Sequence, residues 1–416
     1  MANTKQDKIL NVPNKREQRQ TRLNVPALRF PEFEGDWKTT MLGEIAEFSK
    51  GNGLSKDKLS ENGTPCILYG ELYTKYSSEI IEDVISCTAT EEYNLVLSKV
   101  NDVIIPASGE TAVDISTARC ILKDGILLGG DLNIIRFEDG DGRFFSYQLN
   151  GVRKYDIARI AQGVSVVHLY GDKLKTLNVS FPALKEQTKI ANLLSLLDER
   201  IATQRKIIEK LESLMMGIKK KLLSPNLLCD RIKLSQLGRL KNGYAFKSSL
   251  YTPNGQYNIL TIANVSGERF ISGVCNQIET LPDDIQEYQI LSDNDILISL
   301  TGNVGRVSLN HGNNNLLNQR VGLFQLNDNN LHEFVYQVIS AQTFENIMRH
   351  KAQGAAQMNI GKNDIESYEI PYTTNKILIN KITNTLQRLE ECVMVAHALA
   401  AQYKLQKQYL LQQMFI

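Results

Sequence analysis

The chain has 416 residues, of which 42% are hydrophobic and 22% charged, and its formal net charge is +1. These values are typical of a globular protein with two or three domains, and no apolar run is long enough to span a membrane. The charge is unevenly placed: residues 31–183 carry 15 basic against 23 acidic residues, and residues 225–372 carry 11 against 14. This acidic excess argues against DNA binding by simple positive charge on these two segments.

The first 24 residues are polar, basic and without a hydrophobic period, so segment 1–24 is predicted to be a flexible basic tail. It contains no apolar signal-peptide core. The six cysteines of the chain show no C-x-x-C spacing, and the five histidines show no metal-binding spacing. Free thiols are typical of a reducing cytoplasm, so we expect a cytoplasmic location and no metal site.

Residues 25–37 contain two prolines and a glycine and are predicted to form an extended lead-in, packed by Leu28, Phe30, Phe33 and Trp37. From there to Pro182, β-branched runs alternate with Gly, Asn and Asp turns. Strands are predicted at 65–69, 100–105 and 132–137, and a helix at 144–160. This mixture indicates an α+β domain with short strands.

After Pro182, apolar residues recur at alternating steps of three and four, with Gln204 as the polar exception. A sustained period of about 3.5 residues predicts a coiled-coil helix, and about 35 residues give a rod of roughly 50 Å. Alternatively, the helix covers only its own domain. The run Lys219–Lys221 at its end is expected to be solvated, with a phosphate or partner contact as the alternative. The predicted seam residues are Ile190, Leu194, Leu197, Ile201, Ile208, Leu211, Met215, Ile218 and Leu222.

The rest of the chain repeats this order. Strands are predicted at 259–262, 295–300 and 320–326, a helix at 331–350, and a second heptad helix follows Pro371, with Lys407 as the polar exception. The seam of this second helix contains Ile382, Leu386, Leu389, Val393, Ala396, Ala400, Tyr403 and Leu410.

The two halves also match in sequence. LGEIAEFSKG at 42–51 aligns with LSQLGRLKNG at 234–243, and DVIIPASGET at 102–111 aligns with DILISLTGNV at 295–304. A third match joins the segments 161–182 and 352–371, which run from Ala-Gln-Gly to a proline. A period of roughly 190 residues is too long for a solenoid repeat. It indicates two copies of one globular domain, each followed by a helix.

Catalytic motifs are missing from the sequence. There is no Walker A loop, no glycine-rich dinucleotide fingerprint and no amino-methyltransferase tetrapeptide. The sequence Glu369-Ile370-Pro371-Tyr372 resembles that tetrapeptide only superficially and is better explained as the end of a strand. We therefore predict a protein that binds and organises, with no catalytic residues and no cofactor-binding residues of its own.

The junction at 181–201, FPALKEQTKIANLLSLLDERI, carries a family resemblance. Together with the duplication, it resembles the specificity subunit of type I restriction-modification systems over residues 25–416. At the second junction, Thr374 and Asn375 stand where Glu-Gln is usual. The residues that match the family pattern are Pro182, Leu184, Glu186, Gln187, Ile190, Leu194 and Asp198.

The resemblance implies a domain order and a set of partners. Target recognition domains at 25–182 and 225–371 each read one half of a bipartite double-stranded DNA site. Helices at 183–224 and 372–416 pair as an antiparallel coiled coil that fixes the spacing between the half-sites. Two modification subunits, which use S-adenosylmethionine to methylate adenine N6, dock on the helices, and restriction subunits that use ATP and Mg²⁺ join them.

Base-reading residues are predicted from their type, because hydroxyl, amide, guanidinium and carboxylate groups in loops read base edges. Each candidate could instead be an ordinary turn residue or a surface tyrosine. Two other functions stay open: a helical scaffold that does not read DNA, and an enzyme with an unrecognised catalytic site. The candidates are Tyr69, Tyr73, Tyr76, Ser108, Glu110 and Thr111 in the first copy, and Ser299, Thr301, Asn303, Asn318, Gln319 and Arg320 in the second.

Overall fold

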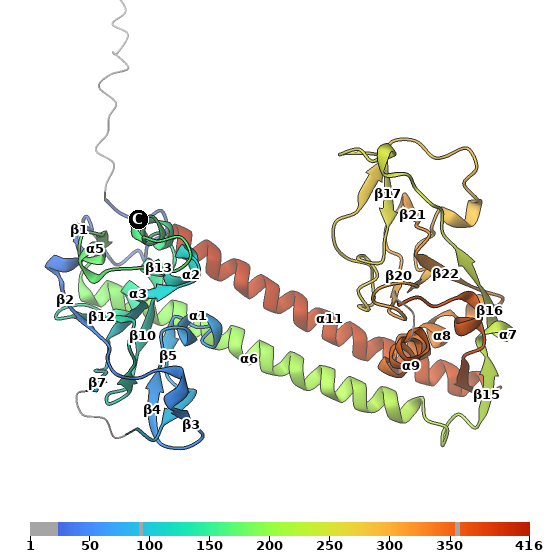
Figure 1. The fold of residues 1–416 in the computed structure, drawn as a ribbon, viewed down its shortest axis with the longest axis horizontal. Helices are drawn as coiled ribbons and strands as arrows, with labels where there is room; N and C mark the ends of the chain where they lie inside the picture. The colour runs from blue at the N-terminus through green and yellow to red at the C-terminus, as the bar shows by residue number, and fades with distance from the viewer. Residues whose placement is uncertain (1–23, 91–94, 354–357) are drawn as a thin grey trace, which may run out of the picture. The chain divides into compact units, whose positions relative to one another are not determined.

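The computed structural model describes residues 24–90, 95–353 and 358–416 (Figure 1). They form two compact units. Unit 1 contains the described residues up to Arg205 together with Ala398–Ile416, and unit 2 contains Lys206–His397. The predicted tail 1–24 lies outside the described residues except for Asn24. The division between the units falls within both long helices, so each unit contains a part of each helix.

Unit 1 is built on two five-stranded sheets, as the α+β prediction expected. The main sheet has the order β2-β12-β8-β10-β5, and the second has the order β3-β6-β4-β11-β7. The main-sheet strands are β2 (Ala46–Lys50), β12 (Leu132–Phe137), β8 (Val103–Pro106), β10 (Arg119–Ile121) and β5 (Ile80–Ile81). The second sheet consists of β3 (Leu59–Ser60), β6 (Ser86–Thr88), β4 (Thr64–Ile67), β11 (Leu127–Leu128) and β7 (Val96–Leu97).

Unit 2 repeats this plan with fewer strands. Its main sheet has the order β16-β22-β19-β20, which matches β2-β12-β8-β10 position by position, and this confirms the duplication. The strands are β16 (Gly238–Asn242), β22 (Val321–Leu326), β19 (Ile296–Ser299) and β20 (Val307–Leu309). A second sheet contains β18 (Asn276–Ile278), β17 (Tyr257–Leu260) and β21 (Asn315–Leu317).

Short helices complete the core of each unit. The helix predicted at 144–160 is present as two pieces, α3 (Gly142–Asn150) and α4 (Lys154–Ile160). Its counterpart in unit 2 is α8 (His332–Ile339) followed by α9 (Gln342–Ala352). Both α3 and α8 bury almost all of their residues, because each lies between the main sheet and the long helices.

A two-stranded ribbon joins the beginning and the end of each body. In unit 1, β1 (Lys38–Met41) pairs antiparallel with β14 (Asn178–Phe181). In unit 2, β15 (Asp230–Lys233) pairs in the same way with β23 (Glu369–Tyr372). The Pro371 motif therefore lies at the end of a strand, as predicted, and a long helix starts directly after each ribbon.

The long helices are α6 (Leu184–Leu222) and α11 (Lys376–Gln413), drawn in light green and red in Figure 1. In unit 1, Ile190 and Leu194 of α6 share a core with Leu410 and Met414 of α11. In unit 2, Ile218 and Leu222 share a core with Ile382 and Leu386. The two helices are thus antiparallel in each unit. Every predicted seam residue is buried or half-buried.

The lead-in packs against α3 and against the last residues of the described chain. The ring of Trp37 lies edge-on to those of Phe144 and Phe415, with centroids 5.7 and 6.5 Å away. The amide of Leu28 donates to the carbonyl of Gln413 at 2.8 Å. The Leu28 side chain is exposed, so it is not part of the core, contrary to the prediction. Residues 398–416 are therefore an integral part of unit 1.

Glu186 and Gln187, which carry the family resemblance, brace unit 1 from inside. Arg29 donates two hydrogen bonds of 2.8 Å to the buried Glu186 carboxylate. The side chain of Gln187 accepts from the amide of Asp141 and donates to the carbonyl of Pro182. At the second junction, the side chain of Asn375 caps α11 instead, accepting from two backbone amides at 3.1 Å. The sequence difference between the junctions therefore reflects different internal braces.

No helix in the described part of the chain combines the length and the apolar character needed to cross a membrane.

Candidate nucleic-acid interface

Three chain segments meet at one edge of each main sheet. In unit 1, Asn133 of β12 pairs with Lys50 at the end of β2, and Leu132 pairs with Pro106 at the end of β8. In unit 2, Gly322 of β22 pairs with Asn242, and Val321 pairs with Ser299. Because these neighbours are antiparallel, two strands end where the middle strand begins. The loops at this edge therefore come close together in both copies.

A fourth segment reaches the same edge. His168 of β13 (Val167–His168) pairs with Ser108 of β9 (Ser108–Gly109) in unit 1. Asn359 forms the equivalent bridge with Thr301 in unit 2. We call the resulting surface the loop edge; it consists of residues 50–51, 107–109, 130–131 and 168 in unit 1, and of 242–243, 300–301, 319–320 and 359 in unit 2.

The glycines that close the first matched motif hold the loop edge together. A side chain at Gly51 would collide with the backbone carbonyl of Gly129, and one at Gly243 would collide with that of Asn318. Glycine is needed at both positions because the turn before β12 or β22 passes close to the end of β2 or β16. This explains why the same glycine ends both copies of the motif.

In unit 2 the loop edge contains a pocket of about 540 Å³. Its polar side chains are mostly exposed. Its lining includes Thr301, whose buried hydroxyl has no hydrogen-bond partner among the described residues. A buried hydroxyl without a partner is unfavourable, so a ligand that bonds to it is stabilised. The pocket is lined by Asn242, Gly243, Leu300, Thr301, Gln319, Arg320 and Asn359.

Most of the predicted candidates of the second copy lie at or beside the pocket. Thr301, Gln319 and Arg320 line the pocket, and Asn303 is exposed in the neighbouring loop. Asn318 holds the turn, because its side-chain oxygen accepts from the amide of Arg320 at 3.3 Å.

Ser299 lies inside the sheet. It is fully buried, and its hydroxyl bonds to the backbone of Asn303 and accepts from the amide of Arg306 at 3.1 Å. The hydroxyl of Ser299 therefore already has its partners below the surface, and the predicted DNA contact of Ser299 stays a prediction.

In the first copy, three candidates have internal partners. The buried Ser108 donates to Asp131 at 3.0 Å, and Thr111 caps α2 (Ala112–Ile115) by accepting from the amide of Asp114 at 3.1 Å. The hydroxyl of Tyr76 accepts from the amide of Ile85 at 3.2 Å, and burial raises the pKa of Tyr76 to about 12. These three side chains stabilise the fold through internal hydrogen bonds, and their predicted base contacts stay predictions.

The remaining candidates of the first copy lie closer to the surface. Tyr69 and Tyr73 are half-buried, and Glu110 is exposed. Burial raises the pKa of Tyr73, with smaller contributions from Tyr69, Asp114 and Glu110, so these groups are near one another. This cluster adjoins the loop edge, because a side chain placed at Gly109 would touch the Tyr73 hydroxyl.

The loop edge also contains residues that the sequence analysis did not predict: Lys50, Asp131 and His168 in unit 1, and Asn242 and Asn359 in unit 2. All five are exposed. Lys50 and Asn242 immediately precede the matched glycine, so the duplication itself could have indicated that pair. His168 and Asn359 could not be found in this way, since their place depends on a bridge between distant segments.

A buried ionic cluster fixes the long helices to the body of unit 1. The ammonium group of Lys407 on α11 pairs with Asp198 on α6 and with Glu79 of the body. The hydroxyl of Tyr147 on α3 donates to Asp198 at 2.8 Å. Burial, and then the charge of Glu79, raise the pKa of Asp198. Lys407, the polar exception in the seam, is therefore a structural cation.

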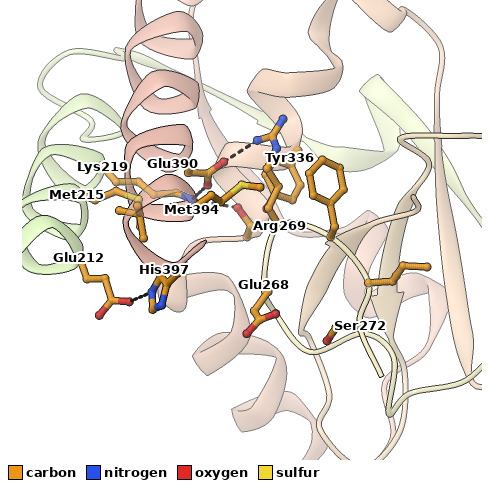
Figure 2. Close-up of a pocket in the computed structure, with 15 residues that line it drawn as sticks. Glu212, Met215, Lys219, Glu268, Arg269, Ser272, Tyr336, Glu390, Met394 and His397 are labelled. Atoms are coloured by element: carbon orange, nitrogen blue, oxygen red, sulfur yellow. Dashed lines mark hydrogen bonds and ion pairs between the residues drawn. The ribbon is translucent and has the colours of Figure 1, made fainter. Parts of the chain in front are cut away.

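Unit 2 contains a related cluster (Figure 2). Arg269 of the body pairs with Glu333 at 2.7 Å and with Glu390 of α11 at 2.6 Å. Lys219 of α6 lies 3.9 Å from Glu390 and donates to Ser340 at 3.0 Å. Burial lowers the pKa of Lys219. The expectation that the run Lys219–Lys221 is solvated is thus wrong for Lys219, which is enclosed between the helices and the body.

A second cavity, of about 680 Å³, lies beside this cluster in unit 2. Figure 2 shows Glu212 and His397 at one side of it, joined by a contact of 2.9 Å. Its charged residues Lys219, Arg269 and Glu390 neutralise one another. The loop edge of unit 2 is the better ligand site, because its exposed amide and guanidinium side chains have no partner among the described residues. Within the described residues, no group of three or more His, Cys, Asp or Glu side chains could hold a metal ion.

Comparisons with known proteins place this architecture. The profile of the type I restriction modification DNA specificity domain matches residues 34–213 and 229–397. The MjaVIII type I restriction enzyme specificity subunit of Methanocaldococcus jannaschii is 23% identical over 399 residues, which cover 88% of this chain and 84% of that protein.

Two solved structures share the fold. The S subunit of a type I restriction-modification system from M. genitalium has a TM-score of 0.63 and 17% identity, covering 94% of this chain and 99% of its own. A chain from a structural study of complex assembly and conformational transition in a type I R-M system has a TM-score of 0.53 and 14% identity, covering 91% and 97%.

Proposed function

The chain belongs to the type I restriction modification DNA specificity family, and from this premise we propose that it selects the DNA site of a type I restriction-modification complex. Each body reads one half of a bipartite double-stranded site. One chain thereby presents two reading surfaces, as a dimeric DNA-binding protein does with two chains.

The observation that carries this proposal is the loop edge, which recurs in both copies at the same place in the same sheet order. In unit 2 it contains amide and guanidinium side chains of the types that read base edges. Surface loops on a rigid sheet are a common location for binding residues, because the sheet holds them in fixed positions.

We also propose that the chain itself is not an enzyme. S-adenosylmethionine then binds the modification subunits, and ATP with Mg²⁺ binds the restriction subunits, as the family membership supports. Purified chain incubated with DNA and labelled S-adenosylmethionine is expected to transfer no methyl groups above a protein-free control. Transfer above that control would contradict this part of the proposal.

Exposed apolar residues on the long helices support docking of partner subunits. In unit 1 they include Leu196 on α6 and Leu405 on α11, which are 57% and 58% exposed. In unit 2 they include Met216 on α6 and Val395 on α11, at 62% and 67%. Contiguous apolar patches mark interaction sites, and these exposed side chains are the candidates for such patches on the two helices. We infer that two modification subunits bind there.

The helices also set the gap between the half-sites in this proposal. α6 has 39 residues, which at 1.5 Å per residue give a length of about 58 Å. A helical turn of DNA is about 34 Å, so a helix of this length is sufficient to separate two half-sites by a turn or more.

Methylation mapping tests the proposed function as a whole. A strain that carries the chain with its modification subunits is expected to show adenine methylation at one bipartite motif, and a strain without the chain is expected to lose it. If methylation is unchanged without the chain, the proposal is wrong.

Gel-shift assays with specific and random duplexes then separate DNA reading from a purely structural role. Binding that prefers the mapped motif supports the proposal. The absence of any sequence preference, with and without modification subunits, would favour the helical scaffold, which the excess of acidic over basic residues in the two bodies also favours.

A further inference from the structure

The pocket at the loop edge of unit 2 has a composition that points to a particular base. The side chains of Asn242, Gln319, Arg320 and Asn359 surround the partnerless hydroxyl of Thr301. None of these four side chains forms a hydrogen bond or ion pair with another residue of the described ranges. Their hydrogen-bonding capacity is therefore available for a ligand.

Of these four residues, Arg320 has the strongest preference for one particular base. It lies in the tight turn between β21 and β22, and it is exposed next to the pocket. Its backbone is fixed from both sides, since Asn318 holds its amide and the amide of Leu300 donates to its carbonyl at 3.0 Å. A guanidinium group on a fixed backbone can present two parallel donors, and guanine offers two matching acceptors, O6 and N7.

The equivalent turn of unit 1 carries the opposite charge. Asp131 directly precedes β12, as Arg320 directly precedes β22, and it is exposed. Its φ of 57° is in the left-handed region that Asp and Asn tolerate best among residues with side chains. One oxygen of this carboxylate, Oδ2, already accepts from Ser108 at 3.0 Å, so Oδ1 is the atom that faces a ligand in this proposal. A carboxylate only accepts hydrogen bonds, so it suits the amino group of cytosine and repels phosphate and the guanine acceptors.

We propose that Arg320 reads a guanine in the second half-site, and that Asp131 at the matched position gives the first half-site a different preference. This proposal rests on the proposed function. It adds that Arg320 and Asp131 determine which base each half-site prefers at this position. The amides of Asn242, Gln319 and Asn359 flank the guanine contact and suit a neighbouring adenine, whose edge offers one donor and one acceptor.

Two substitutions at position 320 separate base reading from phosphate contact. Arg320→Gln removes the charge, whereas Arg320→Lys keeps the charge and removes the planar pair of donors. The full chain in complex with its modification subunits is assayed for methylation of a duplex library with randomised half-sites. Arg231→Gln is the matched control, because Arg231 is exposed on β15 and is not among the residues that line the pocket.

Both variants at 320 are expected to lose discrimination at one guanine position of the second half-site by about tenfold or more, as for one bidentate contact. The first half-site and the control variant are expected to match the unmodified chain. An unchanged second half-site would overturn the proposal. So would Arg320→Lys behaving like the unmodified chain while Arg320→Gln weakens methylation of all sequences, since that pattern indicates a phosphate contact.

Asp131→Asn tests the matched position in the first copy, because asparagine tolerates the same backbone conformation. A base preference that changes only in the first half-site supports the equivalent roles of positions 131 and 320. An unchanged base preference overturns them. Loss of both half-sites in any single variant would assign that residue a structural role and count against the proposal. If the unmodified complex shows no bipartite motif, the proposed function itself fails, which is a distinct result.

Discussion

Lys407 shows how a single residue can connect three parts of a unit. It interrupts the apolar seam of α11, yet its side chain is only 13% exposed and it contacts two carboxylates. One of them, Glu79, is 328 positions away in the sequence. The heptad pattern could show that position 407 faces the seam, but it could not show a partner contributed by a distant loop.

Replacing Lys407 with Met is expected to destabilise unit 1 by about 3–5 kcal/mol near pH 7, the range for breaking a buried ion pair on one side only. The pKa of Asp198 is raised by burial, so the stability linked to its proton is present below the unfolded pKa and is lost as the pH rises through the folded pKa. Without the cation, that pKa rises further. The loss should therefore be smaller near pH 4 and grow toward pH 8 in urea unfolding experiments.

Lys404→Met provides the control for this prediction. Lys404 is exposed on the same helix, so its substitution should change the unfolding free energy by no more than about 0.5 kcal/mol at any pH. A pH-independent loss in Lys407→Met would show that Lys407 acts through packing rather than through its charge.

Phe415 is expected to contribute as much to the stability of unit 1 as a core residue in the middle of the chain. It is 3% exposed, and its ring contacts those of Trp37 and Phe144. Phe415→Ala should destabilise unit 1 by about 3–5 kcal/mol through the cavity it leaves. Hydrogen exchange should then be faster in α3 and unchanged in α8. Tyr409→Ala, at an exposed position of the same helix, should change neither.

Residue type selected both exposed and buried positions at the loop edge. Gln319 and Arg320 were predicted because hydroxyl, amide and guanidinium groups in loops read base edges, and both line the pocket. Ser299 was predicted for the same reason, but it is the last residue of a strand buried along its whole length. Whether a hydroxyl at a strand end faces inward or outward depends on the neighbouring strands, which a single sequence does not specify.

At the scale of elements, long periodic segments were predicted well. Both long helices and the longer strands β8, β12, β19 and β22 were expected within a few residues of their observed bounds. The strands of two residues, such as β7 and β11, were not predicted, because two residues have no measurable period. They form only through pairing with distant partners.

The proposed spacing role of the helices can be tested by lengthening both of them. Four residues inserted after Gln204 in α6 and four after His397 in α11 add about 6 Å, with a residual rotation of roughly 40°. The insertion points are near the division between the units, so the contacts within each unit should be retained. Both half-sites should stay the same, while the gap in the methylated motif grows by about one or two base pairs.

Four residues inserted after Asp124, in an exposed loop of unit 1, serve as the control and should leave the gap unchanged. A folded, active double insertion with an unaltered gap would show that the helices only cover their own domains.

For the whole molecule, duplication predicts that the two reading surfaces are independent. Replacing residues 41–181 with the equivalent body of a relative should change only one half of the methylated motif. The two borders of this exchange lie in β1 and β14, which pair with each other, so the new body is joined to the rest of the chain at two neighbouring strands. Methylome sequencing measures the motif. If both of its halves change, the two units do not read DNA independently.

The inclusion of residues 398–416 in unit 1 has a consequence for the order in which the protein matures. A ribosome makes all of 206–397 before it makes the segment that completes the core around Trp37 and Phe415. We therefore expect unit 2 to fold first during synthesis, although unit 1 comes first in the sequence. Stalled chains ending at residue 397 should show protease resistance in 206–397 and sensitivity in the body of unit 1. An interrupted translation product would thus be exposed to proteolysis before its first reading surface could engage DNA.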